Sequence, residues 1–384
     1  MCTDRRGLSN RAPPRAPALR RQPVEVGRPA RRRFGTQDEG NTMKPRDLAP
    51  FLIFPLLASC SFGAVYAEPR VPTEPIPTEP MELGRLYTRW FLEGETDFLW
   101  DRMTRSLQSV FGDRDHLNLA RAEFLLEEGQ EMTVTDEFLI PWLGSTIYHR
   151  SARHTLADST VWIQWAIRPD GRADGFLVQE EVTPAPTSFL AYETQARLRL
   201  PFNGEWFVFW GGESVPLNFH AAYPDQRFAT DFVIARGGRS YTGDRTANSK
   251  FYCWGEPVLA PAPGTVVTAV DGIPDNVPGE TNDSSALGNH VILDLGDNEY
   301  AFLAHLQQGS VRARPGDRVE RGEQIGSCGN SGTSSEPLVH FHLQNTPIFG
   351  EGAGLPAQFE NYVADSWMMT RGEPRRGQTV TPAS

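Results

Sequence analysis

Long apolar segments are scarce in this chain of 384 residues. The longest, LAPFLIFPLL at residues 48–57, is too short for a good transmembrane helix. Met43, Lys44 and Arg46 precede it and small residues follow it, which is the order typical of a secretory signal peptide. We therefore expect residues 43–67 to be a signal peptide, translation to start at Met43, and no segment to span a membrane.

Two endings of this signal fit the sequence. LLASC is similar to a bacterial lipobox, which would make a lipidated Cys60 the first mature residue and a lipid anchor to the membrane. VYA before Glu68 suits ordinary cleavage after Ala67, and the apolar stretch that continues past Cys60 favours this ending. In both cases we expect an exported protein, periplasmic or associated with the cell envelope.

Cysteine is also rare. Of the four cysteines, Cys2 and Cys60 lie outside the expected mature fold, which leaves Cys253 and Cys328. An oxidising compartment permits a disulfide between these two. Spacing cannot establish it, because pairing depends on the distance between the residues in the fold.

Lysine is nearly absent, since Lys44 and Lys250 stand against 35 arginines. Residues 1–42 hold ten arginines, four acids and almost no apolar periodicity, so we expect them to be disordered and not translated in the native protein. Residues 1–67 carry a net charge of +7, and because the whole chain carries −11, residues 68–384 carry −18. An acidic mature protein is not suited to binding nucleic acid.

The first folded unit is predicted to begin with helices. A Pro-rich linker at residues 68–80 leads into apolar residues at helical spacing over 83–91 and again over 99–107. A third helix, DHLNLARAEFLLEEG at residues 115–129, is expected to stop at its final glycine.

The apolar period then changes. In STVWIQWAI apolar residues alternate, the turn RPDGRADG follows, and FLVQEEV runs back antiparallel. Helices followed by an antiparallel sheet predict a small α+β domain over residues 81–195. Its pattern resembles the nuclear-transport-factor-like folds.

From residue 196 onward the chain is predicted to be β. Gly, Pro, Asn and Asp separate short runs typical of strands. These runs are ARLRLPF, EWFVFWGG, GTVVTAV, NHVILDL, YAFLAHL and VHFHLQ. We expect an all-β antiparallel sheet domain at 196–350, with a surface loop at 271–289 and a C-terminal tail at 351–384.

The stretch SSEPLVHFHLQ, residues 334–344, suggests a metal site in this domain. Side chains alternate along a strand, so Leu338, His340 and His342 would point to the same face. Two imidazoles on one face are what a zinc site recruits.

Several blocks around this stretch resemble the lysostaphin-type (LytM-like) zinc endopeptidases, which cleave peptidoglycan cross-bridges. They are GEPVLAPAPGTVVTAVDG, GNHVILDL, AHLQQGSVRARPGDRVERGEQIGSCGNSGTSSEP and VHFHLQ, in that order. A divergent branch with the lead-in N-x-H…Q-R-[FY]-A-x-D is the most similar, here NFHAAYPDQRFATDF. The resemblance covers roughly residues 215–350 and implies an antiparallel β domain, one Zn2+ and peptidoglycan peptides as substrate.

The resemblance also implies roles for single residues. In this family, zinc is held by the His and Asp of an H-x-x-x-D motif and by the second His of an H-x-H motif, and it lowers the pKa of a water that attacks the peptide carbonyl. Two further histidines, one in an A-H-L strand and one opening the H-x-H, activate water or stabilise developing charge. Carried over by position, Asp231 and His340 are metal ligands and His305 is the catalytic A-H-L histidine.

Two positions depart from the family pattern. Leu338 stands where the first His of the H-x-H motif belongs, so a catalytic imidazole is missing. Arg227 stands where the His of the H-x-x-x-D motif belongs, and on one strand it would share a face with Asp231. An ion pair between Arg227 and Asp231 can replace the metal, or His220 from the preceding loop can supply the missing ligand; the sequence leaves both open.

The remaining candidates also have structural explanations. His342 can fill the pocket wall, or it can replace the lost catalytic histidine if the strand slips by two residues, which keeps its face. His305 can be a hydrogen-bonded core histidine, and His290 a strand-edge residue. The turns at residues 311–326 also occur in lipoyl and biotinyl carrier barrels, but those need a hairpin lysine that this chain lacks.

The sequence thus predicts an exported zinc endopeptidase that hydrolyses peptide bonds of peptidoglycan cross-links. The alternative is a catalytically degenerate protein that keeps the fold and binds the cell wall or regulates a cell-wall hydrolase. Fold and compartment are the same for both, so only the site separates them.

Overall fold

The computed structural model describes residues 75–383. The expected disordered segment at 1–42, the signal peptide at 43–67 with Cys60, and most of the linker at 68–80 lie outside the described residues. None of the helices in residues 75–383 has the length and apolar character that a membrane span requires.

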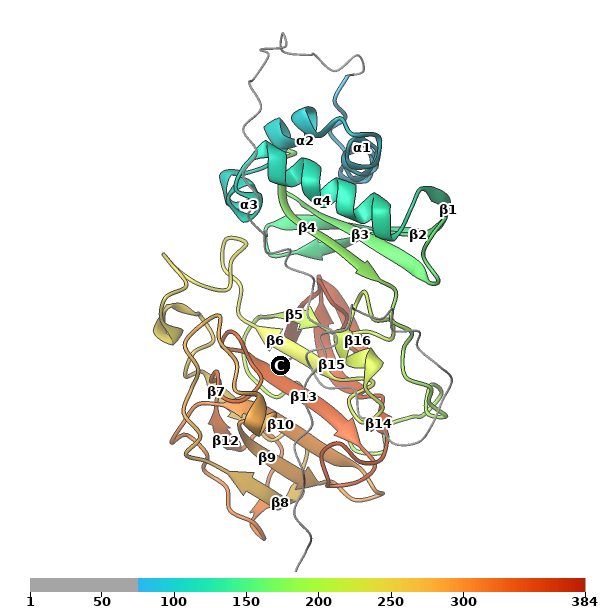
Figure 1. Cartoon of the computed structure of the whole chain (residues 1–384). Helices are drawn as coiled ribbons and strands as arrows, with labels where there is room; N and C mark the ends of the chain where they lie inside the picture. Colours follow the sequence, from blue (N-terminus) through green and yellow to red (C-terminus); the bar gives the residue numbers. More distant parts are fainter. Residues whose placement is uncertain (1–74, 384) are drawn as a thin grey trace, which may run out of the picture. The chain divides into compact units, whose positions relative to one another are not determined.

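The N-terminal domain begins with four helices in the described part of the chain (Figure 1). They are α1 (Pro80–Glu93), α2 (Thr96–Arg102), α3 (Arg105–Phe111) and α4 (Arg114–Glu127). The helix predicted at 99–107 is wrong, because it is split between α2 and α3. Met103 has an extended backbone, and the Thr104 hydroxyl accepts a hydrogen bond from the Leu107 amide, which caps a new helix.

An antiparallel sheet completes this domain, with the helices on one of its faces (Figure 1). Its strands pair in the order β1 (Glu131–Trp142), β2 (Ser145–His154), β3 (Thr160–Ile167) and β4 (Ala173–Glu180). Ile163 and Trp165 of β3 pack with Tyr87 and Phe91 of α1 in one apolar core. The predicted α+β character is confirmed, although β1 and β2 had no alternating pattern strong enough to predict them.

The C-terminal domain is built on an antiparallel sheet that has eleven strands within the described residues. Its order is β11-β8-β9-β10-β13-β6-β5-β17-β15-β16, with β14 paired to β13, and β7 and β12 pair separately. The central strands are β5 (Trp206–Trp210), β6 (Thr230–Val233), β8 (Gly264–Val270), β9 (Asn289–Asp294), β10 (Tyr300–Leu306) and β13 (Val339–Gln344). The shorter or peripheral ones are β7 (Pro257–Leu259), β11 (Arg318–Val319), β12 (Gln324–Ser327), β14 (Gly354–Leu355), β15 (Phe359–Ala364), β16 (Trp367–Gly372) and β17 (Thr379–Pro382).

Two expectations for this domain are wrong. The run at 196–202 is not a strand, and only Leu198 forms an isolated bridge, to Phe359. Residues 351–384 are not a tail, because β17 pairs with β5 and β14 pairs with β13. The physical reason is burial: Phe359, Tyr362 and Val380 lie in the same apolar core as the central strands.

The register of β13 determines which of its side chains point into the core and which residues of β6 and β10 lie opposite them. Val339, Phe341 and Leu343 point into the apolar core. The alternate residues therefore occupy the opposite face of the sheet. Across the sheet, His340 is opposite Asp231 of β6 on one side and Ala304 of β10 on the other.

Candidate metal centre

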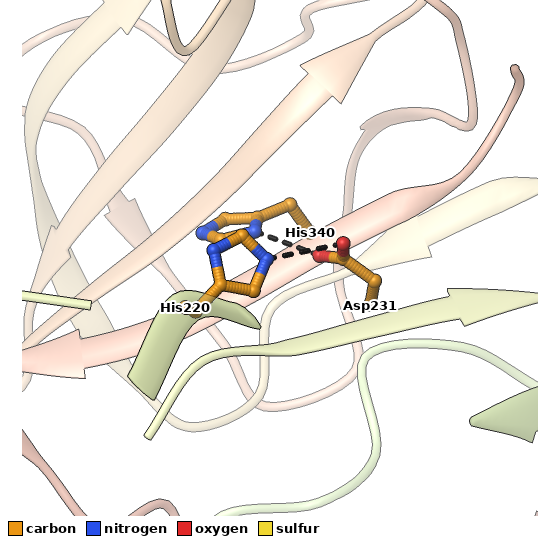
Figure 2. A group of neighbouring side chains, drawn as sticks. All are labelled: His220, Asp231 and His340. Atoms are coloured by element: carbon orange, nitrogen blue, oxygen red, sulfur yellow. Dashed lines mark hydrogen bonds and ion pairs between the residues drawn. The ribbon is translucent and has the colours of Figure 1, made fainter. Parts of the chain in front are cut away.

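Three buried side chains converge between β6, β13 and the loop before β6 (Figure 2). They are His220, Asp231 and His340, and one ligand atom from each lies within 4.8 Å of the others. His220 Nε2 is 3.1 Å from Asp231 Oδ2, and His340 Nδ1 is 2.8 Å from Asp231 Oδ1. The structure thus brings together the three residues expected to bind metal.

Strand pairing and one short turn place these ligands. Asp231 and His340 are directly opposite each other in the antiparallel pair of β6 and β13. His220 lies on the 3-10 turn η2 (Phe219–Ala222), whose cap is the side chain of Asn218. The Asn218 amide donates to the carbonyls of Gly212 and Ala229, both at 3.0 Å, and its oxygen accepts from the His220 amide at 3.2 Å.

The asparagine of the N-x-H lead-in, Asn218, therefore has a structural role. Its hydrogen bonds connect the turn that carries His220 to the segment that enters β6. Sequence reasoning did not identify this residue as functional. The lead-in pattern was its only signal.

Arg227 does not replace the metal by an ion pair with Asp231. It lies in a turn before β6 instead of on the strand, so the two side chains do not share a face. Its guanidinium donates to the carbonyls of Ala185 at 3.0 Å and Glu213 at 2.7 Å. Of the two alternatives left open by the sequence, the geometry agrees with the one in which His220 stands beside Asp231.

The charges of the cluster favour an anionic carboxylate between imidazoles. Burial alone would raise the pKa of the Asp231 carboxyl, but His220 and His340 hold it well below its usual range. Burial lowers the pKa of His220, which favours its neutral form. An ionised carboxylate with two imidazoles is a ligand set that suits zinc.

One orphaned atom supports this fit. Among the described residues, the buried Nδ1 of His220 has no hydrogen-bond partner. Buried polar atoms without partners are rare in folded proteins. The nitrogen and oxygen donors of His220, Asp231 and His340 therefore fit the metal that the resemblance implies.

His305 lies close to this cluster, in a strained part of β10. Its ring centroid is 5.6 Å from that of His340. Its φ of 60° is unusual for a residue other than glycine, and it falls in the bulge between Leu303 and Leu306. Bulges re-aim side chains and are frequent next to active sites.

The protonation of the His305 ring suits a base. Nδ1 is 2.8 Å from the Ser331 carbonyl, so this nitrogen carries the proton and donates. No described residue hydrogen-bonds Nε2. Burial, with a smaller effect of His340, lowers the pKa of His305 to about 4, so the ring is neutral near pH 7.

Leu338 lies two residues before His340 and therefore on the same face of the strand. It packs with Phe207 and Val233 in a small apolar cluster and is buried. Its amide donates to the Gly329 carbonyl at 3.2 Å, which fixes the backbone where the family pattern has a catalytic histidine. At the position of the missing imidazole, the chain therefore has an apolar side chain that packs against its neighbours.

His342 shares the face of His340 but offers no free ring nitrogen. Nδ1 is 2.8 Å from His340 Nε2, and Nε2 is 3.1 Å from the side-chain oxygen of Gln344. The ring is fully buried and stacks on Phe302 at 4.3 Å between centroids. Gln344 was not singled out in the sequence, although its spacing of two and four residues from the histidines is a signal for it.

The other candidates lie apart from this chemistry. His290 bonds to the Gly288 carbonyl at 2.7 Å. Cys253 and Cys328 are both free, buried thiols in the described part of the chain. The disulfide that the sequence permitted does not form in this structure.

The buried His–Asp–His cluster of this β-sheet domain offers nitrogen and oxygen ligands that can hold a metal ion. Residues 250–350 match the model of peptidase family M23. The matched range contains His305, Leu338 and His340, whereas His220 and Asp231 precede it.

Two curated proteins are similar to parts of the chain. Endolysin 2638A of Staphylococcus phage 2638A is 44% identical over 70 residues, which cover 18% of this chain and 14% of the endolysin. The cell division protein DipM of Caulobacter vibrioides is 31% identical over 122 residues, 32% of this chain and 18% of DipM. The chain therefore spans less than a fifth of the length of these relatives.

Among solved structures, the catalytic domain of lysostaphin from Staphylococcus simulans is similar to this chain at 22% identity. The match covers 38% of this chain and 85% of that domain, with a TM-score of 0.24.

Proposed function

We propose that the C-terminal domain is a zinc-dependent endopeptidase that hydrolyses peptide bonds of peptidoglycan cross-links. The observation that carries this proposal is the buried cluster of His220, Asp231 and His340 in an M23-family domain. His220 supplies the imidazole that Arg227 cannot supply, which is why the departure at Arg227 does not by itself remove the site.

The side chains of the site have different roles in the proposed reaction. His220, Asp231 and His340 would hold the zinc, which when bound polarises a carbonyl and makes water a stronger nucleophile. His305 accepts a proton at Nε2, because its Nδ1 proton is held by the Ser331 carbonyl. Leu338 excludes water from the adjacent wall and accepts no proton.

The proposal is tested on the mature chain, residues 68–384, expressed with zinc. We expect about one zinc per chain by elemental analysis and release of peptides from purified peptidoglycan. Both should be lost in His220→Ala and Asp231→Ala. The matched control is His116→Ala, which removes an exposed histidine of the other domain. A wild-type protein that stays metal-free after zinc loading contradicts the proposal.

The second candidate is a protein that binds the cell wall, or regulates a cell-wall hydrolase, without cleaving. The packed position of Leu338 favours it, since one of the two imidazoles of the family pattern is absent. Peptidoglycan pull-down separates the two functions: binding with zinc present but without peptide release supports the regulatory protein.

We also propose that the protein is exported from a start at Met43, with the mature chain beginning at Cys60 or Glu68. The order of charged, apolar and small residues over 43–67 supports this. Intact-mass analysis of the secreted protein distinguishes a lipidated Cys60 from an unmodified Glu68. Arginine-rich peptides from residues 1–42 on that protein contradict the proposed start.

A further inference from the structure

A line of polar side chains runs along one face of β13 away from the metal cluster. His340, His342 and Gln344 follow one another at every second residue, and all three are buried. Each is hydrogen-bonded to the next, at 2.8 Å and 3.1 Å. Buried polar groups in a continuous chain constrain one another, so the direction of each hydrogen bond can be derived.

The far end of the line sets its direction. The Gln344 amide nitrogen lies 2.5 Å from the Thr346 carbonyl and 2.9 Å from the Ile348 carbonyl. Carbonyls only accept, so the amide nitrogen donates and the amide oxygen faces His342. That oxygen also only accepts, and His342 Nε2 must therefore carry a proton.

The proton at Nε2 determines the role of the other ring nitrogen of His342. Its ring is fully buried against Phe302, and neither nitrogen contacts a carboxylate, so a charged ring is disfavoured. A neutral imidazole has one N–H, which is used at Nε2. His342 Nδ1 is therefore an acceptor, and the proton between the two rings belongs to His340 Nε2.

The hydrogen bond from His340 Nε2 to His342 also determines which nitrogen of His340 faces the metal cluster. Metal binding requires a ring nitrogen of His340 that carries no proton. When the single proton of the neutral ring is at Nε2, the bare nitrogen is Nδ1, which lies 2.8 Å from Asp231 Oδ1. Two acceptors at this distance repel each other unless a cation is shared between them. The line of hydrogen bonds thus prepares His340 Nδ1 to be a ligand.

We propose that Gln344 and His342 fix the tautomer and orientation of His340, so that its Nδ1 is presented to the metal. His342 is then a positioning residue and not a catalytic one. This inference rests on the zinc site proposed above, but it concerns residues that do not touch the metal. Outer hydrogen bonds to a ligand histidine are typically worth 10- to 100-fold in metal affinity.

The test measures zinc affinity of the mature chain by competition with a chromophoric chelator. His342→Phe keeps a ring beside Phe302 but removes the acceptor, and we expect affinity to fall 10- to 100-fold. His342→Asn places a carbonyl oxygen near the position of Nδ1, and we expect affinity within about threefold of wild type, since the acceptor is kept.

Two further variants complete the design. Gln344→Met removes the acceptor for His342 at similar size and should weaken zinc binding in the same direction. His290→Phe is the matched control, because it removes a histidine of strand β9, which β10 separates from β13. This variant should bind zinc as wild type does. Far-UV circular dichroism in excess chelator verifies that each variant is folded.

Several outcomes overturn the inference. Wild-type affinity in both His342→Phe and Gln344→Met does so, whether or not hydrolysis is lost. Equal weakening in His342→Phe and His342→Asn also does so, because it indicates packing instead of a hydrogen bond. Should the affinities behave as expected while the wild type releases no peptides, the endopeptidase activity fails and the positioning role stands.

Discussion

At the scale of single residues, Leu338 is the side chain that bears most directly on the proposed activity. It lies in an apolar cluster with Phe207 and Val233, where the family pattern has an imidazole. Leucine neither accepts a proton nor stabilises an oxyanion. The strand itself is in place, so a histidine at this position would lie on the same face as His340.

We predict that Leu338→His increases peptide release at least tenfold, about 1.4 kcal/mol of barrier. Leucine and histidine have similar volume and both branch at Cγ, so the change is sterically modest. Zinc content should be unchanged. Leu338→Asn is the control, since it adds polarity without an imidazole and should give no gain. If Leu338→His gives none either, the regulatory function is favoured.

His305 is the second residue with a specific expectation. The strained backbone and the Ser331 carbonyl hold its ring so that Nε2 can accept a proton. We predict that His305→Ala lowers hydrolysis by about two to four orders of magnitude, the usual worth of a positioned base. Zinc content by elemental analysis should not change. Loss of zinc in this variant would place His305 among the ligands.

At the scale of elements, the C-terminal strands complete the sheet that carries the site. β17 pairs with β5, which in turn pairs with β6, the strand of Asp231. Phe359 and Tyr362 of β15 lie in the core, and the Phe359 ring is 5.1 Å from that of Phe341 on β13.

We predict that a chain ending at Gly350 does not fold stably. Truncation removes the buried side chains of Phe359, Tyr362 and Val380, together worth about 5–9 kcal/mol at the usual value per buried side chain. This is comparable to the whole stability of a typical domain, about 5–15 kcal/mol. Soluble yield and a thermal melt measure the effect, with removal of Ser384 alone as control. A cooperative melt like that of the wild type in the truncated chain would contradict the prediction.

At the scale of the whole molecule, stability should depend on pH through a buried histidine that is not part of the metal cluster. His149 on β2 is fully buried, bonded to Ser151 and Gln164 at 2.9 Å each. Burial, with a smaller effect of the Arg376 charge, lowers the pKa of His149 from 6.5 to about 4. Between these pH values the unfolded chain binds a proton that the folded chain does not.

The stability contributed by His149 is therefore fully present above about pH 6.5 and is lost as the pH falls to about 4. The shift corresponds to about 3 kcal/mol. We predict that His149→Gln, compared with wild type by urea unfolding in excess chelator, loses this part of the pH dependence. The control His116→Gln should keep the wild-type slope. Parallel pH curves for His149→Gln and wild type would contradict the buried neutral state.

Much of this molecule could be predicted from local pattern. The alternation of VHFHLQ places His340 and His342 on one face, and the structure confirms that face. Helical spacing predicted α1 and α4, and alternation predicted β3. Short apolar runs between turn residues predicted five strands of the C-terminal domain, β5, β8, β9, β10 and β13. These features depend on residues a few positions apart, whose geometry is fixed by the backbone period.

The tertiary structure alone decided which residues meet. Arg227 or His220 could stand beside Asp231 in the sequence, and the turn capped by Asn218 brings His220 there. Residues 351–384 read as a tail, yet β17 lies beside β5, about 170 residues earlier in the chain. The sequence by itself thus determined the chemistry available and the face on which each side chain lies. The partners of each side chain depended on pairing between strands distant in the sequence. Core packing decides this pairing, and local spacing does not encode it.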